Sequence, residues 1–198
     1  WYVVTGADVQ TGSLTCNGAV NLILADGAKL TATGGYRQAG VTVSGNGNSL
    51  TIYGQSAQSG QLIAKGGRQG AGIGGGYNQS GSNITINGGK VTATGAEDGA
   101  GIGGGDNCSG SNIIINGGNV IANGGVLNGV GAAGIGGGFW GSGYNIFING
   151  GTVTANVEGK ASGIGGGWEG SGSNIKVATS LTVYADNTNP PTSEILHT

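Results

Sequence analysis

The sequence predicts an all-β fold, a parallel β-helix of about six coils with three short strands in each. Three observations predict it. The motif Ala-Gly-Ile-Gly-Gly-Gly occurs four times with small changes, and its isoleucines, Ile73, Ile102, Ile135 and Ile164, are 29, 33 and 29 residues apart. Segments within each unit alternate apolar residues with polar or small ones, as half-buried strands do. Glycine, at 49 of 198 residues, recurs too often for helices.

Each unit runs from the glycine motif through a loop to Ser-Asn-Ile-x-Ile-Asn-Gly-Gly and then to x-Val-Thr-Ala. These segments predict three columns of strands with inward aliphatic residues. The first column contains Val41, Ile73, Ile102, Ile135 and Ile164. The second contains the pairs Leu22 and Leu24, Leu50 and Ile52, Ile84 and Ile86, Ile113 and Ile115, Ile146 and Ile148, and Ile175 and Val177. The third contains Leu30 and Ala32, Leu62 and Ala64, Val91 and Ala93, Val120 and Ala122, Val153 and Ala155, and Leu181 and Val183.

The two ends depart from the repeat, and three regions are therefore expected. Residues 1–20 are interpreted as an N-terminal cap with the first strand, residues 21–185 as the β-helix repeats, and residues 186–198 as a linker or tail. Pro190 and Pro191 argue against a further regular coil. Since the chain begins at Trp1 and has no Met, we interpret it as a mature or excised fragment tethered to other domains.

Small polar and glycine residues at the corners have structural explanations. The glycines let the backbone of one coil approach the next and leave a strip without side chains. Stacked asparagines are expected to form amide ladders, since Asn tolerates a left-handed backbone and bonds to its copies above and below. These asparagines are Asn83, Asn112, Asn145 and Asn174 before the second column, and Asn87, Asn116 and Asn149 after it.

Composition excludes several function classes. The net charge of −2 with seven Lys and Arg argues against nucleic-acid binding, and no apolar run is long enough to insert into a membrane. The glycine motif lacks the helix or Lys of phosphate-binding loops, and it lacks the Asp of calcium-binding β-rolls. No cofactor or metal site is expected. Cys16 and Cys108 lie three coils apart in this alignment, too far for a disulfide.

The loop after each glycine motif differs between copies, and candidate ligand contacts lie there. Its aromatic residues, expected along one edge of the stack, suit stacking on sugar rings, while amides and carboxylates suit sugar hydroxyls. Trp140 and Trp168 are expected on adjacent coils, about 5 Å apart. An alternative is that the rings only pack over the glycine strip. The candidates are Tyr77, Asn78, Asp106, Asn107, Phe139, Trp140, Trp168 and Glu169.

Acidic residues give little support for an enzyme. Asp98 and Asp106 flank one glycine motif and are able to meet across it, as the two carboxyls of a glycosidase must. However, no Arg or His lies nearby in the repeat, and no Ser-His-Asp set is visible. We therefore expect no catalytic residues. A structural spacer, and a polysaccharide lyase or hydrolase around these two aspartates, remain the alternatives to glycan binding.

The motifs Ala-Gly-Ile-Gly-Gly-Gly and Ile-x-Ile-Asn-Gly-Gly-x-Val-Thr-Ala resemble repeats of large secreted or wall-attached proteins of gut bacteria. The resemblance covers roughly residues 21–184. Those repeats are described as carbohydrate-binding domains and are similar to the right-handed β-helix of the pectate-lyase type. The resemblance implies a right-handed coil, an extracellular or cell-surface location, contact with a polysaccharide or host glycan, and no catalytic residues.

Overall fold

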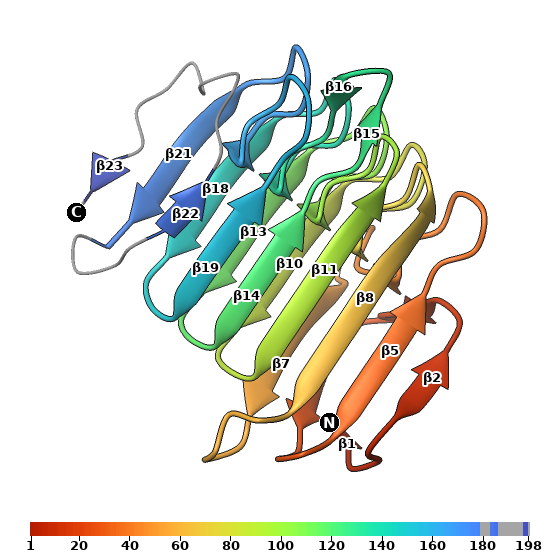
Figure 1. Ribbon diagram of the computed structural model, residues 1–198, viewed down its shortest axis with the longest axis vertical. Coiled ribbons are helices and arrows are strands. Elements are labelled where there is room, and N and C mark those ends of the chain that lie inside the picture. Colours follow the sequence, from red (N-terminus) through yellow and green to blue (C-terminus); the bar gives the residue numbers. More distant parts are fainter. Residues whose placement is uncertain (179–182, 186–195, 198) are drawn as a thin grey trace.

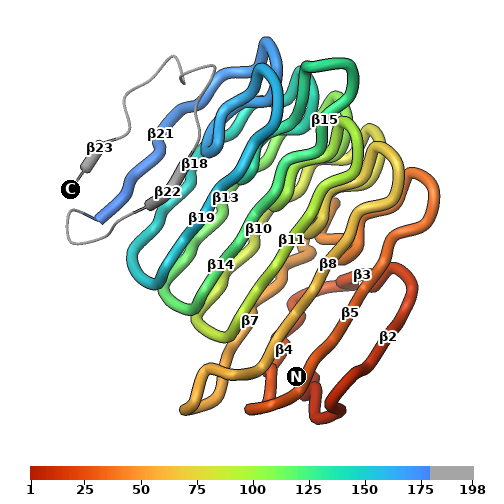
Figure 2. Tube along the Cα trace, viewed as in Figure 1, coloured from red at the N-terminus to blue at the C-terminus, as the bar shows by residue number. Residues whose placement is uncertain are grey.

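The computed structural model describes residues 1–178 and the backbone of residues 183–185 and 196–197. Over these residues the chain winds around one axis, and each turn stacks on the one before it (Figure 1, Figure 2). Three sheets with parallel strand pairs result. This confirms the predicted all-β parallel β-helix of about six coils. The predicted linker, residues 186–198, lies outside the described residues except for the backbone of residues 196–197.

The first sheet, sheet A, corresponds to the predicted second column. It contains β1 (Tyr2–Val4), β4 (Ala19–Leu24), β7 (Ser49–Gly54), β10 (Gly81–Ile86), β13 (Gly110–Ile115), β18 (Gly143–Ile148), β21 (Gly172–Val177) and β23 (Leu196–His197).

Sheet B, the predicted third column, faces sheet A across the core. It contains β2 (Val9–Thr11), β5 (Lys29–Thr33), β8 (Gln61–Arg68), β11 (Lys90–Ala96), β14 (Asn119–Asn123), β19 (Thr152–Asn156) and β22 (Val183–Ala185).

Sheet C, the predicted first column, has very short strands that close the coil. It contains β3 (Leu14–Thr15), β6 (Val41–Thr42), β9 (Ile73–Gly74), β12 (Ile102–Gly103), β17 (Ile135–Gly136) and β20 (Ile164–Gly165). One strand from each sheet, in chain order, makes one rung. Rung 1 is β1, β2 and β3, rung 6 is β18, β19 and β20, and β21 and β22 belong to rung 7.

The core is a stack of identical or similar aliphatic side chains. Ile84 pairs with Ile113, and Ile86 pairs with Ile115, and all four side chains are fully buried. Each buried Ile contributes about 1.5–3 kcal/mol through removal of apolar surface from water. Since parallel pairing places like residues above one another, one inward pattern repeated along the sequence fills the interior from rung to rung.

The expected cap is itself a rung of the solenoid. Tyr2 pairs with Leu22, Val9 pairs with Leu30, and Leu14 pairs with Val41. Strand β4 begins at Ala19 and so crosses the expected boundary at residue 20. Cys16 and Cys108 are both free thiols, in agreement with the expectation that they are too far apart to pair.

The predicted register is wrong by two residues at both ends. Leu22 pairs with Ile52 rather than with Leu50, and Val153 pairs with Val183 rather than with Leu181, which lies outside the described residues. A shift of two residues keeps every inward side chain inward, because the side-chain period of a strand is two. Alternation alone therefore does not distinguish the two registers.

The glycines of sheet C permit close stacking of the rungs. Gly74, Gly103 and Gly136 have φ of 137°, 136° and 136°. A Cβ on Gly103 would lie 2.0 Å from the carbonyl oxygen of Gly136 in the next rung. Both the backbone conformation and the space thus require glycine, which confirms the predicted strip without side chains.

The predicted amide ladders are present along sheet A. The Nδ2 of Asn112 donates to the Oδ1 of Asn83 at 3.2 Å, and the Nδ2 of Asn116 donates to the Oδ1 of Asn87 at 2.8 Å. The first ladder continues through Asn145 and Asn174, and the second through Asn149. The members of the first ladder have positive φ, as expected for Asn at a corner.

Gly103→Ala is expected to destabilise the protein by at least about 2 kcal/mol, since it forces an unfavourable φ and a clash with backbone. Gly12→Ala is the matched control, because nothing lies within 4 Å of a Cβ at Gly12. Urea unfolding followed by circular dichroism measures both variants. Equal stability of the two would contradict the assigned role of the glycine strip.

Candidate functional site at the loop edge

Two sets of loops flank sheet C and form one long edge of the solenoid, here called the loop edge. B–C loops lead from sheet B to sheet C, and C–A loops continue to sheet A. Four C–A loops follow the glycine motifs, at residues 75–80, 104–109, 137–142 and 166–171. The N–H of Asn78 donates to the carbonyl of Asp106 at 3.2 Å, and that of Trp140 to Trp168 at 3.1 Å. Equivalent loop positions therefore lie above one another.

The eight predicted contact residues occupy two adjacent rows of these loops. The first row contains Tyr77, Asp106, Phe139 and Trp168, and the second contains Asn78, Asn107, Trp140 and Glu169. Every second-row residue is exposed, whereas first-row residues are buried or half-buried. The second row thus presents its side chains to solvent, while the first row supports it from below.

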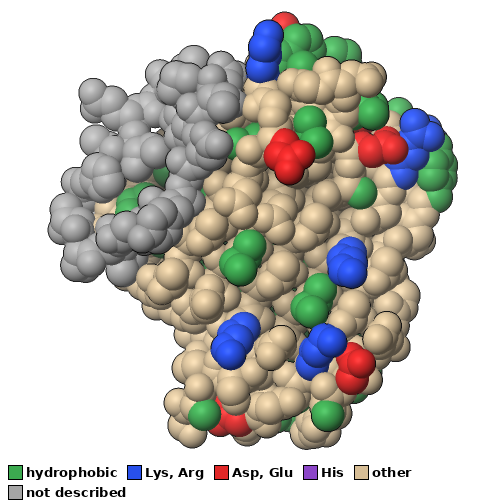
Figure 3. Space-filling model, viewed as in Figure 1, with side chains coloured by type: hydrophobic (Ala, Val, Ile, Leu, Met, Phe, Trp, Pro, Cys, Tyr) green, Lys and Arg blue, Asp and Glu red, His purple; other side chains and the backbone are tan. Residues whose placement is uncertain are grey.

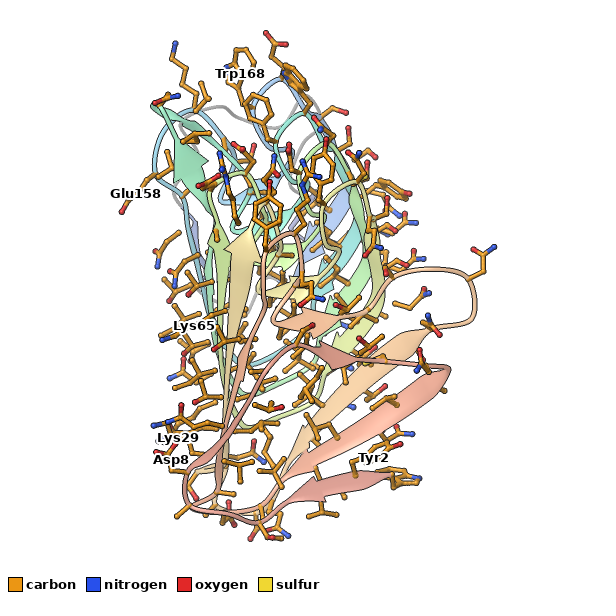
Figure 4. The ribbon with its side chains drawn as sticks, turned by 90° about the vertical axis from the view of Figure 1, so that its right-hand side faces the viewer. Tyr2, Asp8, Lys29, Lys65, Glu158 and Trp168 are labelled. Carbon is orange, nitrogen blue, oxygen red and sulfur yellow. The ribbon has the colours of Figure 1, made fainter. Side chains whose placement is uncertain are left out.

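Three of the predicted aromatic residues form one cluster. The ring of Phe139 stacks on that of Trp168, with centroids 5.2 Å apart and planes inclined by 17°. Trp140 lies 4.6 Å from Phe139 and 6.2 Å from Trp168, tilted against both. Trp140 and Trp168 lie on adjacent rungs as expected, with ring centroids 6.2 Å apart. However, Phe139 rather than Trp140 occupies the position equivalent to Trp168, because Trp140 is one residue further along its loop. Trp168 lies at the opposite end of the molecule from Tyr2 (Figure 4).

Trp140 is held in an unfavourable backbone conformation. Its φ is 57°, and the other second-row residues have φ of 55°, 62° and 56°. Two of those positions hold Asn, which tolerates the left-handed region, but a bulky Trp does not favour it. Trp140 is nevertheless 55% exposed. A strained and exposed aromatic residue at a position where two other rungs have Asn makes Trp140 the leading candidate among the predicted contact residues.

A hairpin borders this cluster. Strands β15 (Val126–Leu127) and β16 (Val130–Gly131) are antiparallel, joined by Asn128 and Gly129, both with positive φ as in a type I′ turn. The carbonyl of Gly131 accepts a hydrogen bond from the N–H of Trp168 at 2.9 Å. The hairpin lies in the repeat with the longer step of 33 residues. Sequence analysis missed it, although Asn-Gly between apolar residues is a strong hairpin signal.

Two aspartates are buried beside the rows. Asp106, in the first row, is 5% exposed, and one of its carboxylate oxygens accepts from the Nε2 of Gln69 at 2.7 Å. Asp98 is 7% exposed. Burial, together with the nearby charges of Asp106 and Glu97, raises the pKa of Asp98 from its ordinary value of 3.8 to about 6. Burial also raises the pKa of Asp106.

The expectation that no arginine lies near these acids was wrong. The Nε of Arg68 donates to Glu97 at 2.8 Å, and the Arg68 charge partly opposes the rise in the pKa of Asp98. The guanidinium of Arg37 lies over the ring of Tyr77, 4.1 Å from its centroid, and its charge partly opposes the rise in the pKa of Asp106. These residues belong to neighbouring rungs, so they are distant in sequence but adjacent along the axis.

Charge is sparse on the remaining surface. On the face in Figure 3, charged side chains are scattered rather than gathered into a patch. Among the described residues, no group of three or more His, Cys, Asp or Glu is arranged to hold a metal ion. In the same part of the chain, no helix has the length and apolarity needed to cross a membrane.

Comparison with known families agrees with this architecture. Four stretches match the beta helix repeat family, at residues 58–77, 84–106, 113–139 and 148–168. Each stretch ends at a first-row residue of the loop edge. No curated protein and no solved structure matches the chain. Together with the stacked parallel sheets, the matches support a right-handed β-helix repeat protein, and each match ends within a C–A loop.

The Asp98→Asn variant is expected to change how stability depends on pH. A carboxyl with a raised pKa stabilises the fold fully below about pH 3.8, and this contribution is lost as pH rises through about 6. Asn does not ionise, so the variant does not lose this contribution. The free energy of unfolding of the variant minus that of the wild type should therefore be larger at pH 7 than at pH 4. Urea unfolding at several pH values measures the difference.

In the Asp98→Asn variant, the free energy of unfolding still decreases as pH rises, with a smaller slope, because the pKa of Asp106 is also raised. Glu158→Gln, which removes the charge of an exposed side chain, is the control. If Asp98→Asn and the wild type differ in stability by the same amount at every pH, the conclusion that burial raises the pKa of Asp98 is wrong.

Proposed function

We propose that the loop edge is a non-catalytic glycan-binding surface of a secreted or cell-surface bacterial protein. Sugar rings stack on the aromatic cluster of Phe139, Trp140 and Trp168, and second-row amides and the carboxylate of Glu169 bond to sugar hydroxyls. The ligand is a polysaccharide or a host or cell-surface glycan. The observation that carries the proposal is the exposed Trp140, held at a φ of 57° where the scaffold does not require an aromatic residue.

The arrangement of the cluster supports this function over simple packing. Phe139 and Trp168 are half-buried and already support one another, so they do not need Trp140 to cover them. The hairpin of β15 and β16 lies beside Trp168 and borders the aromatic cluster. In repeat proteins, insertions of this kind map to loops on one face, which is often the binding face.

Polar residues next to the aromatic cluster extend the proposed binding surface along the axis of the solenoid. Asn78 and Asn107 are exposed in the second row, and the Nδ2 of Asn107 donates to the Oδ1 of Asn78 at 3.4 Å. Each amide retains a further donor and acceptor for a ligand. Successive rungs lie about 4.8 Å apart, so an elongated polymer lying along the axis meets equivalent groups at regular intervals.

Burial of the acids supports a binding role rather than cleavage. Asp98 and Asp106 are both more than nine-tenths buried, and Gln69 already binds Asp106. A glycosidase acid must instead reach the glycosidic oxygen of its substrate. The raised pKa of Asp98 is the one observation that favours a polysaccharide hydrolase as a second candidate.

The double variant Trp140→Ala, Trp168→Ala is expected to lose glycan binding. Truncation of an aromatic residue at the centre of an interface costs about 2 kcal/mol or more, which is roughly a thirtyfold loss of affinity. A glycan array followed by affinity electrophoresis in polysaccharide gels measures it. Trp1→Ala is the control, because Trp1 is a 73% exposed aromatic residue at the other end of the solenoid.

Other results would reject the proposal in distinct ways. Unchanged binding in the double variant would reject the aromatic platform. Absence of binding to any glycan would favour a structural spacer. Release of reducing ends that is abolished in Asp98→Asn would favour the hydrolase.

A further inference from the structure

A polar hollow of about 510 Å³ lies next to the loop edge, at the corner between the C–A loops and sheet A. Serine, asparagine, glutamine and glycine line it, without a charged or an aliphatic side chain. Its residues come from the loop between β6 and β7 and from the starts of β10 and β13 with the loop that precedes β10. None of them belongs to the predicted contact set.

The hollow exists because the loop between β6 and β7 departs from the other C–A loops. It lacks the triple glycine and includes Gly45 and Gly47, with φ of 87° and 82°. The Nδ2 of Asn48 donates to the carbonyl of Ser44 at 2.6 Å and closes the loop on itself. This loop therefore follows its own course and forms one wall.

Hydrogen bonds fix this wall to the next rung. The hydroxyl of Ser44 donates to the Oε1 of Gln79 at 3.3 Å, and the N–H of Ser82 donates to the carbonyl of Val43 at 3.2 Å. Because both contacts cross from one rung to the next, the hollow is formed by the backbone scaffold before any ligand arrives. A preformed site loses less entropy on binding than one that must first close.

The lining offers hydrogen bonds without charge. Ser82 pairs with Ser111 in register, so their hydroxyls follow one another along the axis. Beside them, the Nδ2 of Asn112 donates to the Oδ1 of Asn83 at 3.2 Å. That bond leaves Asn112 with a second N–H and Asn83 with a second lone pair. Neighbouring hydroxyls of a sugar, which both donate and accept, match such a surface. A carboxylate or sulfate would lose its hydration without meeting a cation.

The hollow is connected to the aromatic cluster by polar residues. In sheet A, Tyr144 follows Ser82 and Ser111 at the same register position and is 39% exposed. In the C–A loops, the N–H of Ser142 donates to the hydroxyl of Ser109 at 3.3 Å, and its own hydroxyl lies 3.2 Å from that of Ser171. A hydroxyl row therefore runs along the axis between the two places, over about two or three rungs, or ~10–15 Å.

We propose that this hollow is a second subsite for the polymer that stacks on the aromatic cluster, and that it selects an uncharged sugar unit. The inference rests on the proposed glycan binding and specifies its ligand as a neutral polysaccharide rather than a uronic-acid or sulfated one. Ser82, which is half-buried in the lining of the hollow, bonds to a sugar hydroxyl, the exposed Asn83 and Asn112 fix the orientation of the ring, and Tyr144 supports the next unit.

The test compares binding to neutral mannan, β-glucan and xylan with binding to polygalacturonate, by affinity electrophoresis of the 198-residue chain. The variant Ser82→Ala removes one hydroxyl of the lining and adds no volume, and Ser111, which is only 6% exposed, is left unchanged. The variant is expected to bind the neutral polymer roughly fivefold more weakly, as for the loss of one hydrogen bond. Ser173→Ala is the matched control: Ser173 has the same register position two rungs beyond Ser111, outside the hollow.

Each result bears on one of the two proposals. Weaker neutral-polymer binding in Ser82→Ala, with Ser173→Ala unchanged, supports the subsite, even if Trp140→Ala, Trp168→Ala still binds and the aromatic platform fails. Unchanged binding in Ser82→Ala, with loss in the tryptophan variant, overturns the subsite and leaves the platform in place. Preference for polygalacturonate overturns the selection of uncharged sugars. Binding to none of the four polymers overturns the subsite.

Discussion

Hydrogen bonding between successive rungs in parallel register is the constraint on which the rest of this structure depends. In a central rung, backbone groups pair with the rungs above and below, so each side chain lies about 4.8 Å from its counterparts. Isoleucine over isoleucine and asparagine over asparagine satisfy this condition, whereas like charges stacked in this way repel. The composition follows from it, with only 8% charged residues in the chain. At the glycines of sheet C, the backbones of successive rungs lie so close together that a side chain does not fit between them.

The loop edge is less constrained, and the chemical variety of the chain is found there. One second-row position carries two asparagines, a tryptophan and a glutamate in four consecutive loops without changing the backbone path. At Trp140 the scaffold maintains a conformation that disfavours the side chain, because hydrogen bonds from the next rung fix the loop. The same stacking brings Asp98 close to Asp106 and holds both out of water, which raises the pKa of each.

The sequence was most informative where the repeat is strict. From β10 to β18 the predicted columns, inward isoleucines and corner asparagines agree with the structure, because near-identical repeats leave one register that aligns all of them. At both ends the repeat weakens, and an error of two residues preserved the inward pattern at Leu22 and at Val153. The hairpin of β15 and β16 was missed for a different reason. Its Asn-Gly turn is a local signal within one unit, whereas the repeat period by itself shows only a longer step of 33 residues between Ile102 and Ile135.

The residues by themselves determined the β-helix, the number of coils, the glycine strip and the edge on which the variable loops emerge, because each follows from a pattern repeated along one chain. Tertiary structure decided which side chains meet. It stacked Phe139 rather than Trp140 on Trp168, placed Arg37 over Tyr77 and Arg68 beside Glu97, buried Asp106, and left a polar hollow beside Ser82. These contacts join residues about one repeat apart, and their geometry depends on loop conformations that the backbone of the neighbouring rung imposes.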